Sequence, residues 1–190
     1  MDRHLRHRLE VRLGALLHGP IRQRKDETEI RVAPGDVPQV LTILHDSIDL
    51  RFEVLADLAG VDTGTEMQVV YHLWSPTFED WLRIVAEGIS RDDPRAPSAT
   101  FMWAGAEWLE REAYDMFGIV FEGNRDLRRI LMPADYLSFP LRKDFLLGDD
   151  ASRTPGAGVR QSERAPRPAS FVTGEPAAGP DPAVRRAPAS

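Results

Sequence analysis

The sequence predicts an α+β, two-layer domain with a short antiparallel sheet packed by helices, followed by an extended irregular C-terminal arm and a disordered tail. Alternating apolar segments separated by turn signals, segments with apolar residues at helical spacing, and a proline-rich end predict this class. The expected boundaries are 1–25 for a basic, helical N-terminal segment, 26–148 for the domain with its arm from about 119, and 149–190 for the tail.

The N-terminal part is expected to supply two helices and one strand. Leucines at helical spacing between residues 5 and 17 predict a short amphipathic helix, and Thr28–Val32 predicts a strand that the following Pro-Gly pair ends. Asp36 is expected to cap a helix that extends to about Ile48 with one apolar stripe. Pro38 lies in the first turn of that helix, where its missing N–H costs nothing.

Three further strands are expected over residues 52–59, 66–74 and 81–89. The second alternates Met67, Val69, Tyr71 and Leu73 with the residues of the other face. The connections between these strands are short, and short connections favour antiparallel hairpins over parallel crossovers. We therefore expect an antiparallel meander with one face covered by the helix at 36–48.

A third helix is expected from about Gly105 to Phe117, and Gly118 is expected to end it in the left-handed conformation. Its predicted buried stripe is Leu109, Ala113, Met116 and Phe117. The pairs Glu107–Arg111 and Arg111–Asp115 have the i,i+4 spacing of ion pairs on another face. Residues 119–147 show no regular period and contain two prolines, so they are expected to form an irregular arm, either ordered or disordered, and its aromatic content favours order.

The last part of the chain has the composition of a disordered tail. Residues 151–190 contain seven of the fifteen prolines and few apolar side chains, which cannot offset the entropy of ordering. They also hold six Arg and three acids, so the net charge of −6 divides into +3 for this tail and −9 for the rest. An acidic body argues against nucleic-acid binding, which needs a basic face.

Composition excludes several kinds of chemistry. The chain has no cysteine, which rules out disulfides, thiolate catalysis and cysteine-ligated iron–sulfur clusters within it. No apolar run approaches the roughly 20 residues that span a bilayer, and the basic N-terminus has no apolar region of a secretory signal behind it. The expectation is a cytoplasmic chain that reaches a membrane only through a partner.

No catalytic set appears in the sequence. Glycine-rich phosphate loops, a Gly-x-Ser-x-Gly elbow and zinc-binding histidine spacings are all absent. Glu110, Glu112 and Asp115 could serve as acid and base, but no nucleophile or oxyanion donor accompanies them. We expect these carboxylates to form ion pairs, and we expect no active site, metal or cofactor in this chain.

Residues 107–145 combine dense charge with aromatic and aliphatic side chains throughout. A solvated charged surface would not need the aromatic residues, and a simple core would not need Arg128, Arg129, Arg142 and Lys143. Because aromatic residues and Arg are enriched at protein interfaces, the mixture predicts a surface that another protein covers.

The same stretch resembles the C-subunit of the proton-pumping NADH–quinone oxidoreductase, respiratory complex I, which is related to the mitochondrial iron–sulfur protein 3. The resemblance rests on Glu110-Arg-Glu-x-Tyr-Asp-Met-Phe-Gly-Ile119, Asp126-Leu-Arg-Arg-Ile-Leu-Met-Pro133 and Pro140-Leu-Arg-Lys-Asp-Phe145, in that order. It covers roughly residues 28–148. The chain departs from the family pattern at Asn124-Arg125, Ser138-Phe139 and Leu146.

The resemblance implies a non-catalytic structural subunit without its own cofactor, located at the cytoplasmic side of the cell membrane. Its partners would be the quinone-site D-subunit and the iron–sulfur subunits of the peripheral arm, with FMN and the iron–sulfur clusters held by partner subunits. Glu110 to Asp115 would order the helix against the arm, and the basic residues and Asp144 would pair with neighbouring subunits. The full set expected at interfaces is Glu110, Arg111, Glu112, Tyr114, Asp115, Phe117, Gly118, Asp126, Arg128, Arg129, Pro133, Arg142, Lys143 and Asp144.

Two alternatives stay open. One is the equivalent subunit of a related membrane-bound hydrogenase or other donor-linked dehydrogenase, which the departures from the pattern leave possible. The other is a free-standing interaction or nucleic-acid-binding module that uses the Arg-rich arm, which would bind with steep salt dependence.

Overall fold

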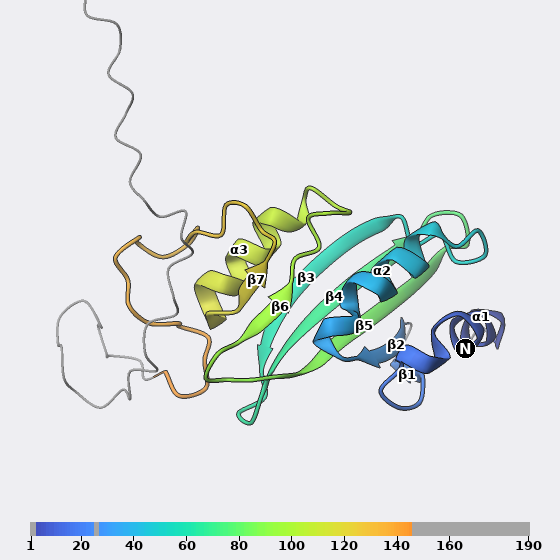
Figure 1. Cartoon of the computed structure of the whole chain (residues 1–190), viewed down its shortest axis with the longest axis horizontal. Helices are drawn as coiled ribbons and strands as arrows, with labels where there is room; N and C mark the ends of the chain where they lie inside the picture. Colours follow the sequence, from blue (N-terminus) through green and yellow to red (C-terminus); the bar gives the residue numbers. More distant parts are fainter. Residues whose placement is uncertain (1–2, 25–26, 146–190) are drawn as a thin grey trace, which may run out of the picture.

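The computed structural model describes residues 3–24 and 27–145 (Figure 1). The predicted tail, 149–190, lies outside the described residues, and so does Leu146. The elements in chain order are α1 (Arg3–Leu13), a 3-10 turn (Gly14–Leu16), β1 (Arg22–Arg24), β2 (Glu27–Val32), a second 3-10 turn (Pro34–Asp36), α2 (Val37–Asp46), β3 (Val54–Asp62), β4 (Met67–Ser75), β5 (Asp80–Ile89), β6 (Arg95–Pro97), α3 (Ala106–Phe117) and β7 (Val120–Glu122).

The main sheet has five strands in the order β1-β2-β5-β4-β3. The predicted antiparallel meander is confirmed, since β3 pairs with β4 and β4 with β5, both antiparallel. The sheet is larger than this meander because β2 pairs with β5 in parallel, with Ile30 opposite Ile84. Helix α2 and strands β3 and β4 lie between β2 and β5 in the sequence. This long connection allows β5 to run in the same direction as β2, since parallel neighbours need a crossover and cannot be joined by a tight turn.

One face of the sheet forms the core. Ile30, Ile84 and Tyr71 are cross-strand neighbours and are at most 1% exposed. Buried residues of α1, α2 and α3 join them in a single cluster, and α2 crosses the strands in Figure 1. The alternation in β4 therefore predicted the buried face correctly. The other face carries a row of charged groups in which Arg83 lies 3.2 Å from Glu29.

The helices differ from their expected bounds at the ends. In the described part of the N-terminal segment, α1 and a 3-10 turn are helical. The chain then forms β1, which the helical expectation for 1–25 missed. Helix α2 ends at Asp46. Asp36 occupies the N-cap position, as expected, but its side chain makes no capping hydrogen bond. Gly118 does end α3 in the left-handed conformation, with φ 77°, as predicted.

A small second sheet ties the arm to the domain. Strands β6 and β7 pair in parallel, with Ala96 opposite Phe121, on either side of α3 in the sequence. Both strands were missed, because each has only three residues and too short a pattern to detect. Among the described helices, none is long and apolar enough to span a membrane.

Candidate functional site

The arm is held to helix α3 by one buried carboxylate. Asp115 is completely buried, and its Oδ2 accepts hydrogen bonds from the backbone N–H groups of Ile130, Leu131 and Met132 at 3.0, 2.7 and 2.8 Å. Its Oδ1 accepts one from Arg129 Nη1 at 2.5 Å. Three consecutive backbone donors aimed at one oxygen fix the local course of the arm.

Electrostatics keep Asp115 charged. Burial alone would raise the pKa of this carboxyl, but the hydrogen bonds from Met132, Arg129, Leu131 and Ile130 outweigh it and lower the pKa below the ordinary value. The arginine is itself enclosed, because Arg129 also donates to Ser138 O and lies over the ring of Phe139. Arg129 is therefore part of an internal ion pair.

A second buried carboxylate, Glu110, organises the start of the arm. It accepts hydrogen bonds from Ala99 N at 2.6 Å, from Ser98 Oγ at 2.9 Å and from Asn124 Nδ2 at 2.8 Å. Asn124 also accepts from the N–H of Asp126. Glu110 thus joins the loop after β6 to the segment after β7.

The donors to Glu110 are neutral, so burial dominates its ionisation. Burial raises the pKa of Glu110, and the bonds from Ala99, Asn124 and Ser98 only partly oppose that rise. Tyr71 nearby is fully buried as well, and among the described residues its hydroxyl has no hydrogen-bond partner. Burial, with the charge of Glu110 adding to it, raises the pKa of Tyr71.

Arg111 connects the helix to the arm in a different way. Its guanidinium donates to the backbone carbonyls of Arg128 and Arg129 at 3.2 and 3.3 Å. It also lies over the ring of Trp108, 4.8 Å from the ring centroid. Its nearest carboxylate oxygen, on Asp126, is 4.0 Å away, so this arginine acts mainly as a backbone donor.

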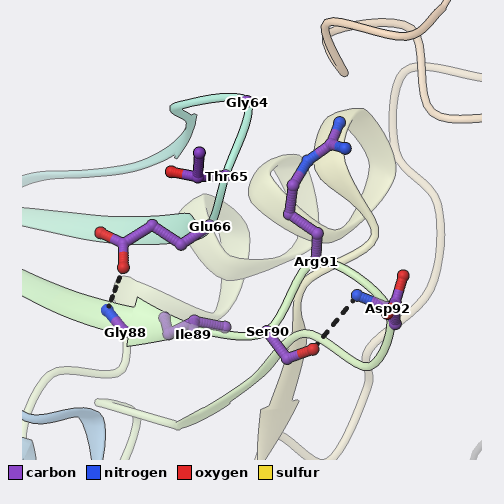
Figure 2. Close-up of a pocket in the computed structure, with 8 residues that line it drawn as sticks. All are labelled: Gly64, Thr65, Glu66, Gly88, Ile89, Ser90, Arg91 and Asp92. Carbon is purple, nitrogen blue, oxygen red and sulfur yellow. Dashed lines mark hydrogen bonds between the residues drawn. The ribbon is translucent and has the colours of Figure 1, made fainter.

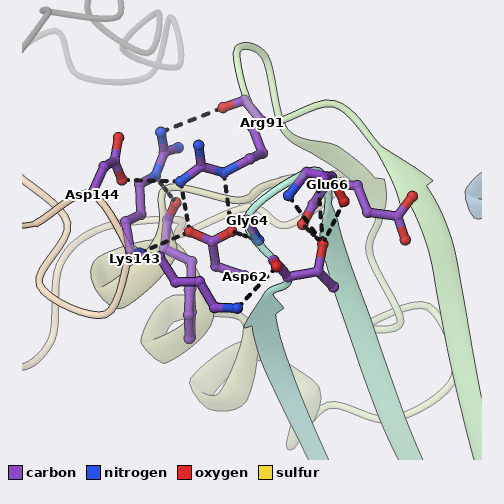
Figure 3. Close-up of polar contacts among 10 residues, drawn as sticks. Asp62, Gly64, Glu66, Arg91, Lys143 and Asp144 are labelled. Atoms are coloured by element: carbon purple, nitrogen blue, oxygen red, sulfur yellow. Dashed lines mark hydrogen bonds and ion pairs between the residues drawn. The ribbon is translucent and has the colours of Figure 1, made fainter.

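The far end of the arm is fixed at the β3–β4 hairpin, as Figure 3 shows. Asp62 accepts from Arg91 Nη2 at 2.7 Å and from the N–H groups of Lys143 at 2.9 Å and Gly64 at 2.8 Å. Burial alone would raise the pKa of Asp62, but these bonds lower it to about 2. Arg91 also bonds to Asp144 at 3.0 Å, so Asp62 and Arg91 together hold residues 143 and 144.

Two glycines allow the close packing between these anchors. A Cβ on Gly60 would lie 2.6 Å from the Phe117 ring, and one on Gly118 would lie 2.6 Å from the Phe139 ring. Arg142 covers the same point, since its Nε donates to Phe117 O at 2.7 Å and its guanidinium stacks on Phe139. The end of α3 is thereby enclosed between β3 and the arm.

The structure corrects the expected environment of α3. Ala113 and Met116 are buried as predicted, but Glu110, Arg111 and Asp115 are buried too, because the arm covers the polar side of the helix. The pairs expected at i,i+4 spacing are replaced, within the described residues, by contacts of Asp115 and Arg111 with the arm. Glu110 accepts only from neutral donors, so the ion pair expected for it was wrong, whereas Asp115 does pair with an arginine.

The predicted site residues separate into two groups. Nine are buried or half-buried and make contacts within the chain: Glu110, Arg111, Tyr114, Asp115, Phe117, Gly118, Asp126, Arg129 and Arg142. Five are exposed: Glu112, Arg128, Pro133, Lys143 and Asp144. Of these five, Arg128, Lys143 and Asp144 also bond to other residues of the chain. Their role at subunit interfaces remains a prediction for both groups.

Sequence reasoning missed several residues that build this site. Ser98, Asn124, Asp62 and Arg91 hold the anchors described above. Asn124 lies where the chain departs from the family pattern, which was the one available signal. The others precede α3 in the sequence, and no local pattern marks them.

The arm presents apolar side chains outward. Leu131, Leu137 and Leu141 are 62%, 71% and 55% exposed, and Trp108 on α3 is 57% exposed. The described residues hold no cluster of metal-binding side chains. An open pocket of about 460 Å³ at the β3–β4 hairpin is lined by polar groups that bond to each other, such as Gly88 N to Glu66 and Asp92 N to Ser90 (Figure 2). Aromatic side chains such as the exposed Trp108 are enriched in protein interfaces.

Comparison with known proteins identifies the family of this chain. Residues 30–151, more than half of the chain, match the family of the respiratory-chain NADH dehydrogenase, 30 Kd subunit. The chain belongs to this family. It is 39% identical over 144 residues to the NADH-quinone oxidoreductase C-subunit of Salinispora arenicola, and 44% identical over 145 residues to that of Roseiflexus castenholzii.

The matches differ in how much of each protein they cover. The alignment covers 74% of this chain in both cases, but 58% of the Salinispora protein and 82% of the Roseiflexus protein. Among solved structures, a trypsin-resistant fragment of Nqo5 has a TM-score of 0.51 and 29% identity, covering 64% of this chain and 97% of the fragment. A chain of an archaeal membrane-bound sulfane sulfur reductase has a TM-score of 0.63 and 25% identity, and the match covers 77% of this chain and 88% of that chain.

Proposed function

We propose that this chain is a non-catalytic structural subunit of the peripheral arm of a respiratory NADH–quinone oxidoreductase. In this role it helps to assemble the iron–sulfur and quinone-site subunits that pass electrons from NADH to quinone, coupled to proton translocation. Membership of the 30 Kd subunit family supports the assignment. Two structural observations also support it. The buried carboxylates of Asp115 and Asp62 hold the arm in place, and leucines of the arm remain exposed.

The proposal includes the location of the electron carriers. FMN and the iron–sulfur clusters would be bound by partner subunits, and this chain would hold none of them. The partners proposed are the quinone-site D-subunit and the iron–sulfur subunits, on the cytoplasmic side of the membrane. An exposed apolar arm on an acidic body is suited to such contacts, since interfaces gain most of their energy from buried apolar and aromatic anchors.

A second candidate is the equivalent subunit of a related membrane complex with another electron donor or acceptor. The likeness to a chain of the archaeal sulfane sulfur reductase complex favours it, since that chain shares the fold over 77% of this one. The two candidates differ in the partner that exchanges electrons with the substrate.

Native purification separates them. A tagged full chain is purified from detergent-solubilised membranes of the organism that encodes it, and the bound proteins are identified by mass spectrometry. We expect an NADH-oxidising flavoprotein and NADH-dependent quinone reduction by the purified material. A hydrogenase large subunit or a sulfur reductase subunit in its place would support the second candidate, and a chain that purifies alone would refute both.

A further inference from the structure

The outer surface where α3 meets the arm combines residues from both segments. The ring of Trp108 lies 4.8 Å from the guanidinium carbon of Arg111. The same guanidinium donates to the backbone carbonyl of Arg128 at 3.2 Å. Because one buried side chain contacts both, Trp108 and the arm at residue 128 belong to one continuous surface.

This surface is rigid before any partner binds. Leu131 has a side chain that is 62% exposed, yet its N–H donates to the buried carboxylate of Asp115 at 2.7 Å. The backbone on which Leu131 stands is therefore fixed, and Arg111 restrains the Trp108 ring. Association then costs little additional ordering entropy, which favours binding through these groups.

The positive charge of this surface is only partly matched within the chain. Arg129, Arg142 and Lys143 use their side chains on internal acceptors. Arg128 is exposed and pairs with Asp126 alone, at 3.0 Å, and Arg125 contacts no carboxylate among the described residues. The exposed guanidinium of Arg128, which only one Nε–carboxylate bond engages, is suited to a partner that offers carboxylates, because Arg can bind them with two parallel hydrogen bonds.

We propose that Trp108, Arg128 and Leu131 form one anchor that binds an apolar pocket bordered by carboxylates on a neighbouring subunit. This rests on the proposed function and specifies the chemistry of the partner surface. Trp and Arg are the residue types most enriched among those that dominate binding energy, and here they are adjacent and pre-ordered. Trp108 lies in the 107–145 stretch predicted to be covered by another protein, although it was not in the set of residues expected at interfaces, and in this proposal it is the central one.

The test replaces each anchor residue in the full chain. Tagged wild-type chain, Trp108→Ala and Arg128→Glu are produced in place of the native copy, and native gels of solubilised membranes give the ratio of complex-bound to free chain. We expect each substitution to lower this ratio roughly tenfold. Arg128→Lys should have a smaller effect, because Lys keeps the charge but loses the paired geometry.

Matched controls separate docking from folding. Trp81→Ala removes another exposed tryptophan, at the start of β5 and the opposite end of the sheet from the arm, and should leave the ratio unchanged. Thermal midpoints of the purified chains show whether a variant folds. If Trp108→Ala lowers its midpoint, Leu131→Asp repeats the test at a side chain that is already exposed.

The outcomes are distinguishable. If the wild-type chain enters a large complex and the Trp108 and Arg128 variants enter it equally well, the anchor is refuted while the proposed function stands. An equal loss in Trp81→Ala would also refute the anchor, since the effect would not be specific to this surface. If the wild-type chain never enters a complex, the proposed function fails and the anchor with it.

Discussion

Replacing Asp115 with alanine tests whether one carboxylate holds the arm to the domain. The substitution would remove the acceptor of three backbone N–H groups and of one hydrogen bond from the Arg129 guanidinium, which keeps its bonds to backbone carbonyls. Each hydrogen bond to a charged group contributes about 1.5–3 kcal/mol, so the four bonds would sum to roughly 6–12 kcal/mol if the arm stayed in place.

The measured loss should be smaller, because the arm can detach and expose these groups to water. Breaking a buried ion pair by removing one partner costs about 3–5 kcal/mol, which we take as the expected loss in the free energy that keeps the arm docked. By the usual relation, about 1.4 kcal/mol per factor of ten, amides of residues 129–142 should then exchange hydrogen at least roughly 100-fold faster.

Hydrogen exchange with mass spectrometry on the isolated full chain measures this directly. Asp115→Asn should give an intermediate effect, because its carbonyl can still accept from the backbone while its NH₂ group faces Arg129. Glu112→Ala is the control, since Glu112 is exposed on the same helix. Unchanged exchange over 129–142 in Asp115→Ala, with Glu112→Ala also unchanged, would refute the role assigned to Asp115.

Three further predictions concern the other anchors. Gly118→Ala should destabilise the chain by roughly 2–4 kcal/mol, because it places a Cβ on a residue with φ 77° and 2.6 Å from the Phe139 ring. Chemical unfolding should show a lower midpoint, and an unchanged midpoint would contradict the close packing at Gly118. The bonds to Asp62 lower the pKa of its carboxyl from 3.8 to about 2. The ionised carboxylate therefore adds about 2 kcal/mol to the free energy of unfolding above pH 4, and this contribution is lost as the pH falls from about 4 to 2. In Asp62→Asn this part of the curve of stability against pH should be flatter. Asn124→Ala removes a donor to the buried Glu110 and should cost about 1–3 kcal/mol in urea unfolding, whereas Arg125→Ala next to it, on an exposed side chain, should be neutral within about 0.5 kcal/mol.

The sequence predicted the strands of the meander well because their pattern is local. In β4 the alternation of Met67, Val69, Tyr71 and Leu73 directly reflects one buried face. The parallel pairing of β2 with β5 has no local signal, since it depends on where the chain returns after α2 and two intervening strands. Composition and alternation thus gave the class and most strands, but not the full strand order.

The candidate site was predicted as a region but not in its contacts. Helical spacing placed Arg111 and Asp115 in an ion pair on the surface of α3, and the arm instead draws both inward. Backbone N–H groups at 130–132 supply most of the bonds to Asp115, and every residue type except proline has such a group, so no sequence pattern marks them. Reversing Arg129 would consequently disturb the fold, so of these two adjacent arginines Arg128 offers the cleaner test of docking.

The position of β5 has a consequence for how the chain folds. Strand β5 lies at the centre of the sheet, between β2 and β4, yet it is the last of the five strands to be synthesised. The β1–β2 hairpin therefore has no partner in the sheet until residue 89 has left the ribosome, and pairing over such a sequence separation is slow. We expect nascent chains that end before β5 to remain protease-sensitive, with protection arising in one step as β5 joins the two halves of the sheet.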